Sequence, residues 1–526
     1  MSGWSDIRPC VAGQREALID SLGQPREQQL RLLRHILKSN QDTEFGQRFD
    51  FRTVGSMAEY QQRIALHDYD DFRAAIDRMM AGAENVLCAE KVLLFERTSG
   101  STGGDKFLPF VESGLHAMRN ALLPWLDDLL TARPGILRGK AYWSISPANR
   151  QKSHTPGGIP LGMDNDALYF GEHLALAITT TLAVPASVAA IASFDDWQLA
   201  TLCHLLACED LSFVSVWSPT YFLQLLDSVP SDIDRIAAAI ESGRMEIGFA
   251  EQLLQPNATR AKQLRRLFAT DPPQWDKIWP ALDTISCWDS ASSRKYADEL
   301  RKRFPTTHVQ GKGLLATEGV VTVPLSGASS PVLAVDSGVY EFVAGTGEVL
   351  LPWELETGQT YAVIITTAAG LYRYQLGDRV TVTGWHEATP CLKYVGRECG
   401  GSDLCGEKLT VDFVEMALDD IPGFSLLVPV TDPRPAYLLL LDAALITEAQ
   451  EQAVATQVDH NLMRNSQYRY ARDLGQLPAP MPRRIKNPLG VYKDICMSSG
   501  QQLGNIKVSA LASDLWAIQF HTRISG

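Results

Sequence analysis

The sequence lacks the features that are typical of nucleic-acid-binding and membrane-associated proteins. It carries 48 lysine and arginine residues against 61 aspartate and glutamate residues, giving a formal net charge of −13. There is no basic run that could offset this acidity locally. Nucleic acid and anionic membrane surfaces are therefore not expected partners. The first residues, MSGWSDIRPC, also lack a basic segment followed by an apolar one, so no signal peptide is predicted.

A long, purely apolar segment is missing as well. The longest uncharged stretch runs from Leu174 to Phe194 and is long enough to cross a bilayer, but it contains three threonines and a central Pro185. We therefore expect a buried helix followed by a buried strand at this place.

The nine cysteines show neither the spacing of a disulfide framework nor that of a metal site. Cys203 and Cys208 flank His204 on an apolar, helix-like segment, where packing in the core is the favoured interpretation. This cysteine usage is typical of a reducing compartment and predicts a cytoplasmic protein. The sequence leaves the oligomeric state open, with a monomer favoured.

The arrangement of periodic segments indicates a mixed α/β protein of two domains. Residues 14–40 and 57–81 read as helices, while 320–385 reads as strands separated by glycine, serine and aspartate turns. A glycine-rich joint at 396–406 precedes a further helix and strand pattern. We predict a large domain over 1–396, with sheets, helices and an antiparallel or barrel-like section, and a smaller α+β domain over 397–526.

The stretch TSGSTGGDK, from Thr98 to Lys106, follows a strand-like run and has the composition of a phosphate-binding loop. Glycines let backbone N–H groups converge on an anion, while the hydroxyls and the lysine add donors and charge. It is not a Walker motif, because no glycine precedes Lys106 and Phe107 stands where a magnesium-binding hydroxyl is needed. A flexible hairpin is the plain alternative.

Further segments turn this hint into a resemblance. They are GKGLLATEG (311–319), GLYRYQLGD (370–378) and the Gly396-Arg397 pair. In order and approximate spacing, these segments resemble the three signatures of the adenylate-forming superfamily, which includes acyl-CoA synthetases and peptide-synthetase adenylation domains. Within it, the chain is most similar to the auxin-responsive Gretchen Hagen family of acyl acid amido synthetases. The segments that carry this similarity include SNQDTEFGQRFDF (39–51), SVWSPTYFLQLLD (215–227) and NSQYRYARDLGQL (465–477).

The resemblance implies a two-step reaction with ATP and Mg²⁺. A carboxylic acid would form an acyl-adenylate and release pyrophosphate, after which an amino acid or another amine would form an amide and release AMP. Phosphate contacts are implied for Ser99, Gly100, Ser101, Thr102, Gly103 and Lys106.

The same resemblance implies roles in the second and third signatures. Thr317 would donate to the α-phosphate, Glu318 would bind magnesium, and Ala316 would lie at the nucleotide. Asp378 would accept hydrogen bonds from the ribose hydroxyls, and Arg397 would lie beside the same ribose. Tyr372 would border the nucleotide.

The superfamily also uses a lysine near the C-terminus that reaches the reacting carboxylate. Lys507 is the favoured candidate here, and Lys493 is the rival. A solvated surface lysine is the alternative for either one. The hinge between the domains would fall at Glu398, Cys399 and Gly400. The chain departs from the superfamily pattern at Asp105, where proline is frequent, and at Leu314 or Leu315, where an aromatic residue is usual.

The identity of the substrates is less defined. His154, Trp217 and Tyr221 are candidate contacts for the acid, although a loop histidine and core aromatics are the equal alternatives. An acyl-CoA ligase would use the same adenylate with CoA as the acceptor, and the Arg483-Arg484-Ile485-Lys486 run could then meet the CoA phosphate. A nucleotide-binding regulator without activity is a third hypothesis, which the complete set of adenylation residues disfavours.

Overall fold

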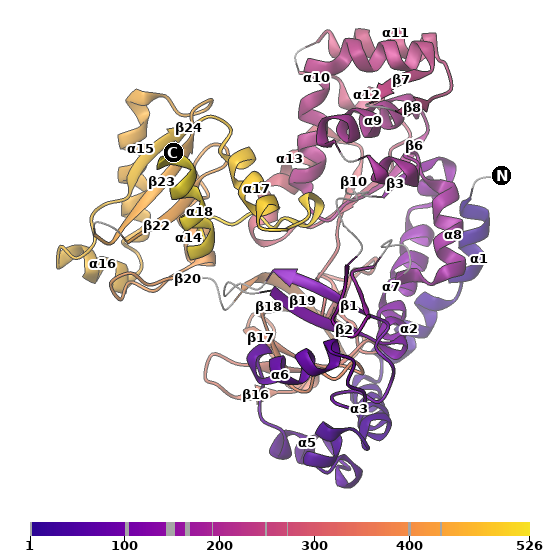
Figure 1. Cartoon of the computed structure of the whole chain (residues 1–526), viewed down its shortest axis with the longest axis vertical. Helices are drawn as coiled ribbons and strands as arrows, with labels where there is room; N and C mark the ends of the chain where they lie inside the picture. Colours follow the sequence, from indigo (N-terminus) through magenta and orange to yellow (C-terminus); the bar gives the residue numbers. More distant parts are fainter. Residues whose placement is uncertain are drawn as a thin grey trace.

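A run of helices forms the N-terminal part of the chain. The computed structural model describes residues 3–99, 105–143, 153–163, 169–191, 193–247, 250–270, 272–397, 401–431 and 434–525. The first helices are α1 (Trp4–Val11), α2 (Gln14–Leu22), α3 (Pro25–Asn40), α4 (Glu44–Arg48), α5 (Met57–Arg63) and α6 (Tyr69–Met80). Local sequence sets their ends, because α3 begins at a proline, and capping boxes at Ser56 and Asp68 start α5 and α6. Figure 1 places α5 at one end of the long axis and α11 at the other.

A small sheet and a long helix follow. Strands β1 (Leu94–Ser99) and β2 (Asp105–Phe110) form an antiparallel hairpin, and β5 (Pro160–Leu161) and β4 (Ser153–His154) extend it in the order β2-β1-β5-β4. Helix α7 (Glu112–Ala132) follows β2 after a single residue. Its buried residues join one core with the N-terminal helices and the antiparallel sheet described below.

The middle of the chain builds a parallel sheet in the order β10-β9-β6-β3. Its strands are β3 (Lys140–Trp143), β6 (Leu211–Ser215), β9 (Thr284–Cys287) and β10 (His308–Gly311). The elements between them are α8 (Glu172–Thr181), α9 (Phe194–Ala207), α10 (Pro219–Ser242), β7 (Arg244–Ile247), β8 (Ala250–Leu253), α11 (Ala258–Phe268), α12 (Trp275–Ile278) and α13 (Arg294–Arg303). Because the strands are parallel, their carboxyl ends share one edge, which is where ligands bind in open α/β sheets.

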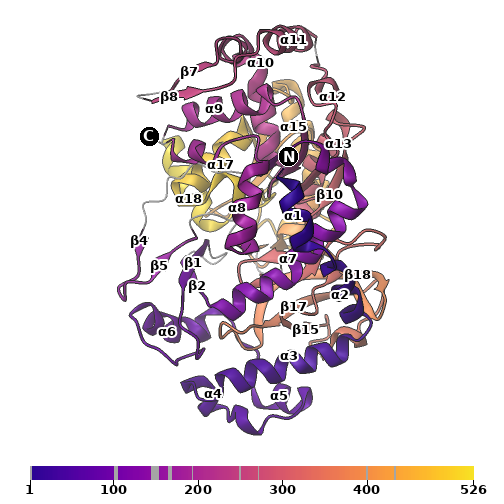
Figure 2. The same cartoon turned by 90° about the vertical axis from the view of Figure 1, so that its right-hand side faces the viewer.

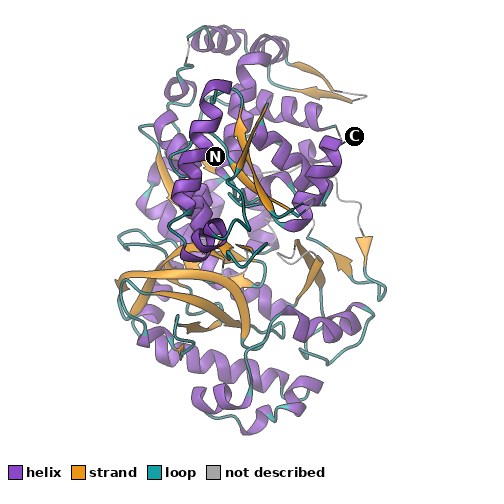
Figure 3. Cartoon of the chain, turned by 90° about the vertical axis from the view of Figure 1, so that its left-hand side faces the viewer, coloured by secondary structure: helices purple, strands orange, loops and turns teal. Residues whose placement is uncertain are grey.

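The segment predicted to be antiparallel is confirmed. After the short hairpin β11 (Leu315–Ala316) and β12 (Gly319–Val320), a seven-stranded sheet runs in the order β13-β14-β19-β18-β17-β15-β16, so β13 and β16 are its edge strands. The strands are β13 (Thr322–Val323), β14 (Val332–Leu333), β15 (Val339–Val343), β16 (Val349–Leu350), β17 (Thr360–Thr366), β18 (Tyr374–His386) and β19 (Thr389–Arg397). Figure 3 shows the strong curvature of its long strands.

The C-terminal segment forms a three-stranded sheet covered by helices. Its elements are β20 (Gly401–Ser402), β21 (Leu409–Thr410), α14 (Val411–Leu418), β22 (Leu426–Val430), β23 (Ala436–Asp442), α15 (Glu448–Leu462), α16 (Ser466–Asp473), β24 (Met481–Ile485), α17 (Pro488–Ser498) and α18 (Asp514–Ser525). One face of β22-β23-β24 shares a core with α14, α15 and α16. The other face shares a core with α17, α18 and the helices around the parallel sheet. Figures 1 and 2 show this segment beside α13 and α10.

The segment Leu174–Phe194 differs in part from its expectation. A helix is present, as α8, but a 3₁₀ helix over Ala186–Ala190 follows it in place of a strand. Pro185 provides a physical reason, because it caps that turn and has no N–H to donate to a sheet. Among the residues that the structure describes, none of the helices combines the length and apolar character that a membrane span requires. The predicted mixed α/β architecture is confirmed.

Candidate active site

The β1–β2 hairpin carries the predicted phosphate loop. Its last described pair is Ser99 with Asp105, where β1 ends and β2 begins. Gly100, Ser101, Thr102 and Gly103 lie outside the described residues. Lys106 is the second residue of β2, and its Nζ lies 3.4 Å from the Tyr374 hydroxyl and 5.4 Å from the centroid of the Tyr69 ring. The hairpin therefore holds a cation against two aromatic faces directly beside the loop.

Thr317 and Glu318 form the two-residue turn of the β11–β12 hairpin, in which Ala316 pairs with Gly319. Gly319 approaches β17 closely, because a Cβ atom there would lie 2.7 Å from Cδ1 at the end of the Ile365 side chain, which would have to shift. This close approach holds the turn against β17. Burial and the Asp378 charge raise the pKa of Glu318, against the opposing influence of Arg397 and Lys106. A cation at this carboxylate would relieve that cost.

Asp378 and Arg397 face one another across β18 and β19, where they are paired in register. The Nε atom of Arg397 donates to Oδ1 of Asp378 at 3.0 Å. The Asp378 side chain is 1% exposed, whereas that of Arg397 is 33% exposed. Burial alone would lower the pKa of Arg397, but the Asp378 and Glu318 carboxylates raise it overall. The pair therefore offers a fixed acceptor with a permanent cation next to it.

Lys507 reaches this region from the C-terminal segment. Its Nζ lies 5.3 Å from the centroid of the Trp288 ring and 6.0 Å from that of Tyr394. The Lys507 side chain is exposed, but desolvation by the surrounding protein still lowers its pKa, while Asp378 and Glu318 oppose that shift. Lys507 thus shares one electrostatic environment with both carboxylates. It also lines a pocket together with Trp288, Ser290, Ser292, Ser293, Gly313, Leu314, Leu315 and Tyr394.

Lys493 has a different environment. It lies on α17 with 2% of its surface exposed, and its Nζ donates to the Thr220 carbonyl at 3.0 Å and to Gln224 Oε1 at 2.8 Å, both on α10. Burial lowers the pKa of Lys493 to about 7. Of the two candidate lysines, only Lys507 lines this pocket.

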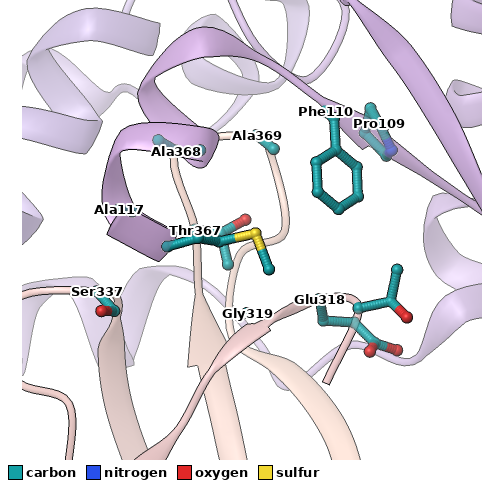
Figure 4. Close-up of a pocket in the computed structure, with 12 residues that line it drawn as sticks. Pro109, Phe110, Ala117, Glu318, Gly319, Ser337, Thr367, Ala368 and Ala369 are labelled. Carbon is teal, nitrogen blue, oxygen red and sulfur yellow. The ribbon is translucent and has the colours of Figure 1, made fainter. Parts of the chain in front are cut away.

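A second pocket lies on the other side of the β11–β12 turn and holds about 380 Å³ of space, part of it open to solvent. Figure 4 shows Phe110 and Glu318 on one side of it and Ala117, Ala368 and Ser337 on the other. Small residues at Gly114 and Ala117 of α7 leave this room. The remaining lining residues are Pro109, Met118, Thr317, Gly319, Thr367 and Ala369.

Several residues expected at the site lie elsewhere. Tyr372 is fully buried, donates its hydroxyl to the Leu87 carbonyl at 2.7 Å and stacks on Phe45. The Tyr221 hydroxyl bonds to that of Tyr142 within the core around α10. His154 is exposed on β4 and lines neither pocket.

Trp217 lies nearer to the site. Its ring centroid is 6.0 Å from that of Trp288, which lines the Lys507 pocket.

Other residues of the pocket were missed by the sequence analysis. Trp288 and Ser290, Ser292 and Ser293 follow β9 at the carboxyl edge of the parallel sheet, a position that signals ligand binding once parallel strands are recognised. Tyr394 belongs to β19 just before Arg397, and Tyr374 belongs to β18.

The chain matches domains of a known protein family and is similar to named relatives. The model of the GH3 family N-terminal domain matches residues 14–309, and that of the GH3 family central domain matches 332–397. The indole-3-acetic acid-amido synthetase GH3.4 of Arabidopsis thaliana is 22% identical over 71% of this chain and 67% of its own length. The probable GH3.1 synthetase of the same plant is 25% identical over 70% of this chain and 66% of its own.

Solved structures show the same fold. The GH3.15 acyl acid amido synthetase in complex with 2,4-DB has a TM-score of 0.82 at 18% identity, covering 97% of this chain and 95% of its own. A 2-hydroxyisobutyryl-CoA ligase in the postadenylation state has a TM-score of 0.56 at 12% identity, with 95% and 92% covered.

Proposed function

Because the chain belongs to the GH3 family, we propose that it is an ATP-dependent, AMP-forming acyl acid amido synthetase. The observation that carries the proposal is that the Asp378–Arg397 pair acts electrostatically on both Glu318 and Lys507, each of which lines a pocket. Relatives named as amido synthetases and a related structure that holds 2,4-DB support a small carboxylic acid as one substrate and an amino acid as the other.

The Lys507 pocket is the proposed nucleotide site. Trp288 and Tyr394 offer aromatic faces for the adenine ring, and the serine hydroxyls at its edge offer hydrogen bonds. Asp378 would accept hydrogen bonds from the ribose hydroxyls, because Arg397 holds its carboxylate in place. A carboxylate accepts hydrogen bonds and does not donate them, which suits contacts with ribose hydroxyls.

The phosphates would lie between the β1–β2 and β11–β12 hairpins. We propose that Ser99, Gly100, Ser101, Thr102 and Gly103 hold the leaving pyrophosphate, with Lys106 beside them. Thr317 and the neighbouring Ala316 would contact the α-phosphate.

Glu318 is the residue that would hold Mg²⁺. Among the described residues, no group of three or more acidic, histidine or cysteine side chains gathers into a metal cage. One carboxylate plus substrate phosphates is the usual magnesium set, and the raised pKa of Glu318 fits a site that takes a cation. The bound ion would neutralise phosphate charge.

The pocket of Figure 4 is the proposed site of the acid, since its apolar walls end at Thr317 and Glu318. A carboxylate oxygen of the acid attacks the α-phosphorus and pyrophosphate leaves. Lys507 stabilises the negative charge that this step concentrates between the two groups. The amine nitrogen of the acceptor then attacks the acyl carbon, loses a proton, and AMP leaves.

We further propose two domains, 1–396 and 397–526, with the second moving between half-reactions. The joint at Glu398, Cys399 and Gly400 lies outside the described residues. Each cysteine that the structure describes is a free thiol, which supports a reducing, cytoplasmic location. A monomer is the proposed state.

Pyrophosphate release tests the function directly. The protein would be incubated with ATP, magnesium and a panel of carboxylic acids, each alone, with mixed amino acids, and with CoA. Acid-dependent release that amino acids stimulate, together with AMP and a new amide in the mass spectrum, is the expected result. Stimulation by CoA alone would instead identify an acyl-CoA ligase. If none of the acids in the panel caused pyrophosphate release, the proposal would be contradicted.

A further inference from the structure

Lys312 is a buried lysine near the candidate site; it lies in the segment GKGLLATEG, and the resemblance implies no role for it. Lys312 follows β10 at the carboxyl edge of the parallel sheet and is 8% exposed. Its Nζ donates to Ser215 Oγ at 2.8 Å. The same atom lies 5.4 Å from the centroid of the Trp125 ring and 5.2 Å from that of Trp217. The ammonium group is thus enclosed by one hydroxyl and two indole faces.

Among the described residues, this ammonium group has no carboxylate partner in an ion pair. Within the part of the chain that the structure describes, no acidic side chain forms an ion pair with Lys312. Buried lysines are rare unless they are paired, because removing the charge from water is costly. Burial lowers the pKa of Lys312 to about 8, which still leaves the amine mostly protonated at neutral pH. Lys493, by contrast, has two carbonyl oxygens as acceptors.

Helix α7 connects Lys312 to the proposed acid pocket. Gly114, Met118, Ala121 and Trp125 follow one another at intervals of three or four residues and so share one face of α7. Gly114 and Met118 line the acid pocket, and Trp125 packs against Lys312. Seven residues separate Met118 from Trp125, which corresponds to about 10 Å along a helix.

The orientation of Trp125 is fixed. Its indole N–H donates to Gln310 Oε1 at 2.9 Å, on the strand that leads into Lys312. Lys312 therefore lies against the part of α7 about two turns beyond Met118, a separation that a small aromatic or medium-length acid can span.

We propose that Lys312 binds a second anionic group of the acid substrate. The substrate would then be a small carboxylic acid with a carboxylate or another anion at the end remote from the reacting carboxyl. This inference rests on the proposed function, because it assigns a substrate class to the same acid pocket. The substrate anion supplies the counter-charge that the protein does not provide.

Matched pairs of acids test the inference. Hexanoate and adipate, octanoate and suberate, and benzoate and terephthalate differ only in the second carboxylate. Acid-dependent exchange of pyrophosphate into ATP, measured without amino acids, reports on adenylation alone. For at least one pair we expect the dianion to have a higher kcat/KM by about tenfold or more. Lys312→Met should abolish that preference, mainly through a raised KM for the dianion. Lys493→Met, the matched buried lysine, should keep it.

Other results would overturn the inference. The wild type could prefer the monoanion of each pair, or Lys312→Met could keep the preference of the wild type. An unchanged exchange combined with a raised KM for the amino acid in Lys312→Met would assign the lysine to the acceptor instead. If Lys312→Met does not fold, Lys312→Gln serves for the same comparison.

Thermal unfolding separates a failure of this inference from a failure of the proposed function. If no acid in the panel supports exchange, the proposed function is contradicted. A dianion should even then raise the melting temperature of the wild type and not that of the Lys312 variant. Equal shifts in both proteins, or no shift in either, would overturn the inference.

Discussion

Two of the regions in which the C-terminal segment meets the rest of the chain differ in the kind of contact they make. At α17 and α18, aromatic side chains such as Tyr492 and Trp516 join the core around α10. Lys493 on α17 donates hydrogen bonds to the Thr220 carbonyl and to Gln224 Oε1 on α10. At Lys507 the contact consists of a cation over two aromatic rings that line a pocket. The first region anchors the segment through apolar burial. The second presents a charge to a space where a ligand would bind, so the two regions should respond to mutation in different ways.

The largest expected effect concerns Lys507. In Lys507→Ala, acid-dependent pyrophosphate release should fall by about 100-fold or more, because one preorganised charge at the reacting groups is lost. Circular dichroism and the melting temperature should stay close to those of the wild type, since this lysine contributes little apolar burial.

Lys302→Ala is the matched control, because Lys302 is an exposed lysine on α13. It should keep full activity. A variant Lys507→Ala that adenylates normally would contradict the assignment of Lys507 to the reaction.

Asp378→Ala should separate the role proposed for the Asp378–Arg397 pair from that of Lys507. Loss of the carboxylate removes hydrogen bonds to the ribose and leaves Arg397 without its partner. Such charged hydrogen bonds are worth about 1.5–3 kcal/mol, so the Kd for ATP should rise by roughly tenfold or more. Calorimetric titration without acid measures it. Lys507→Ala should change this Kd much less, and equal losses in both variants would mean that both residues act on the nucleotide.

The anchoring region should show a dependence of stability on pH that can be assigned to Lys493. Burial lowers the pKa of Lys493 to about 7, from about 10.4 in an unfolded chain. Between these values the unfolded chain binds more protons, so the stability from this group rises with pH. The free energy of unfolding of the wild type, relative to Lys493→Met, should therefore increase from pH 7 to pH 10. The slope is at most about 1.4 kcal/mol per pH unit.

Urea denaturation of both proteins at several pH values measures this difference. Lys312 titrates in both proteins, so its contribution cancels in the comparison. A difference that does not depend on pH would show that Lys493 has an ordinary pKa.

The smallest effect is expected at a third contact of the C-terminal segment. Arg294 on α13 and Asp419 after α14 form an ion pair of 3.1 Å, and both side chains are more than half exposed. Exposed pairs contribute about 1 kcal/mol or less. A double-mutant cycle with Arg294→Ala and Asp419→Ala should give a coupling free energy in that range, which decreases with added salt. A larger coupling would mean that this contact, too, anchors the segment.

Local sequence was enough to predict several parts of the fold, and the candidate site residues that it singled out lie partly within local hairpins. The break between α2 and α3 follows from Gly23 and Pro25, and the antiparallel section follows from its turn residues. The two-residue turn at Thr317 and Glu318 and the pair Asp378–Arg397 lie within single hairpins, so residues near in sequence bring them together.

The prediction for Tyr372 shows where such reasoning ends. Tyr372 and Tyr374 are two residues apart, and simple alternation would place them on the same face. Arg373 between them takes a φ of +48°, which interrupts the strand geometry just before β18 begins. Tyr372 consequently packs on Phe45, while Tyr374 lies beside Lys106. A positive φ at an arginine has no signature in the sequence.

The sequence by itself determined the chemical class of the site, because the hydroxyls, carboxylates and glycines of an adenylation site occur in short segments whose turns form locally. The tertiary structure alone decided which lysine faces the pocket, and it brought Trp288, Tyr394 and Lys507 together from three distant segments. It also placed Lys312 between two tryptophans, with no ion pair to an acidic side chain in the part of the chain that the structure describes. Such contacts depend on how sheets and helices pack, and packing is a property of the whole chain rather than of any one segment.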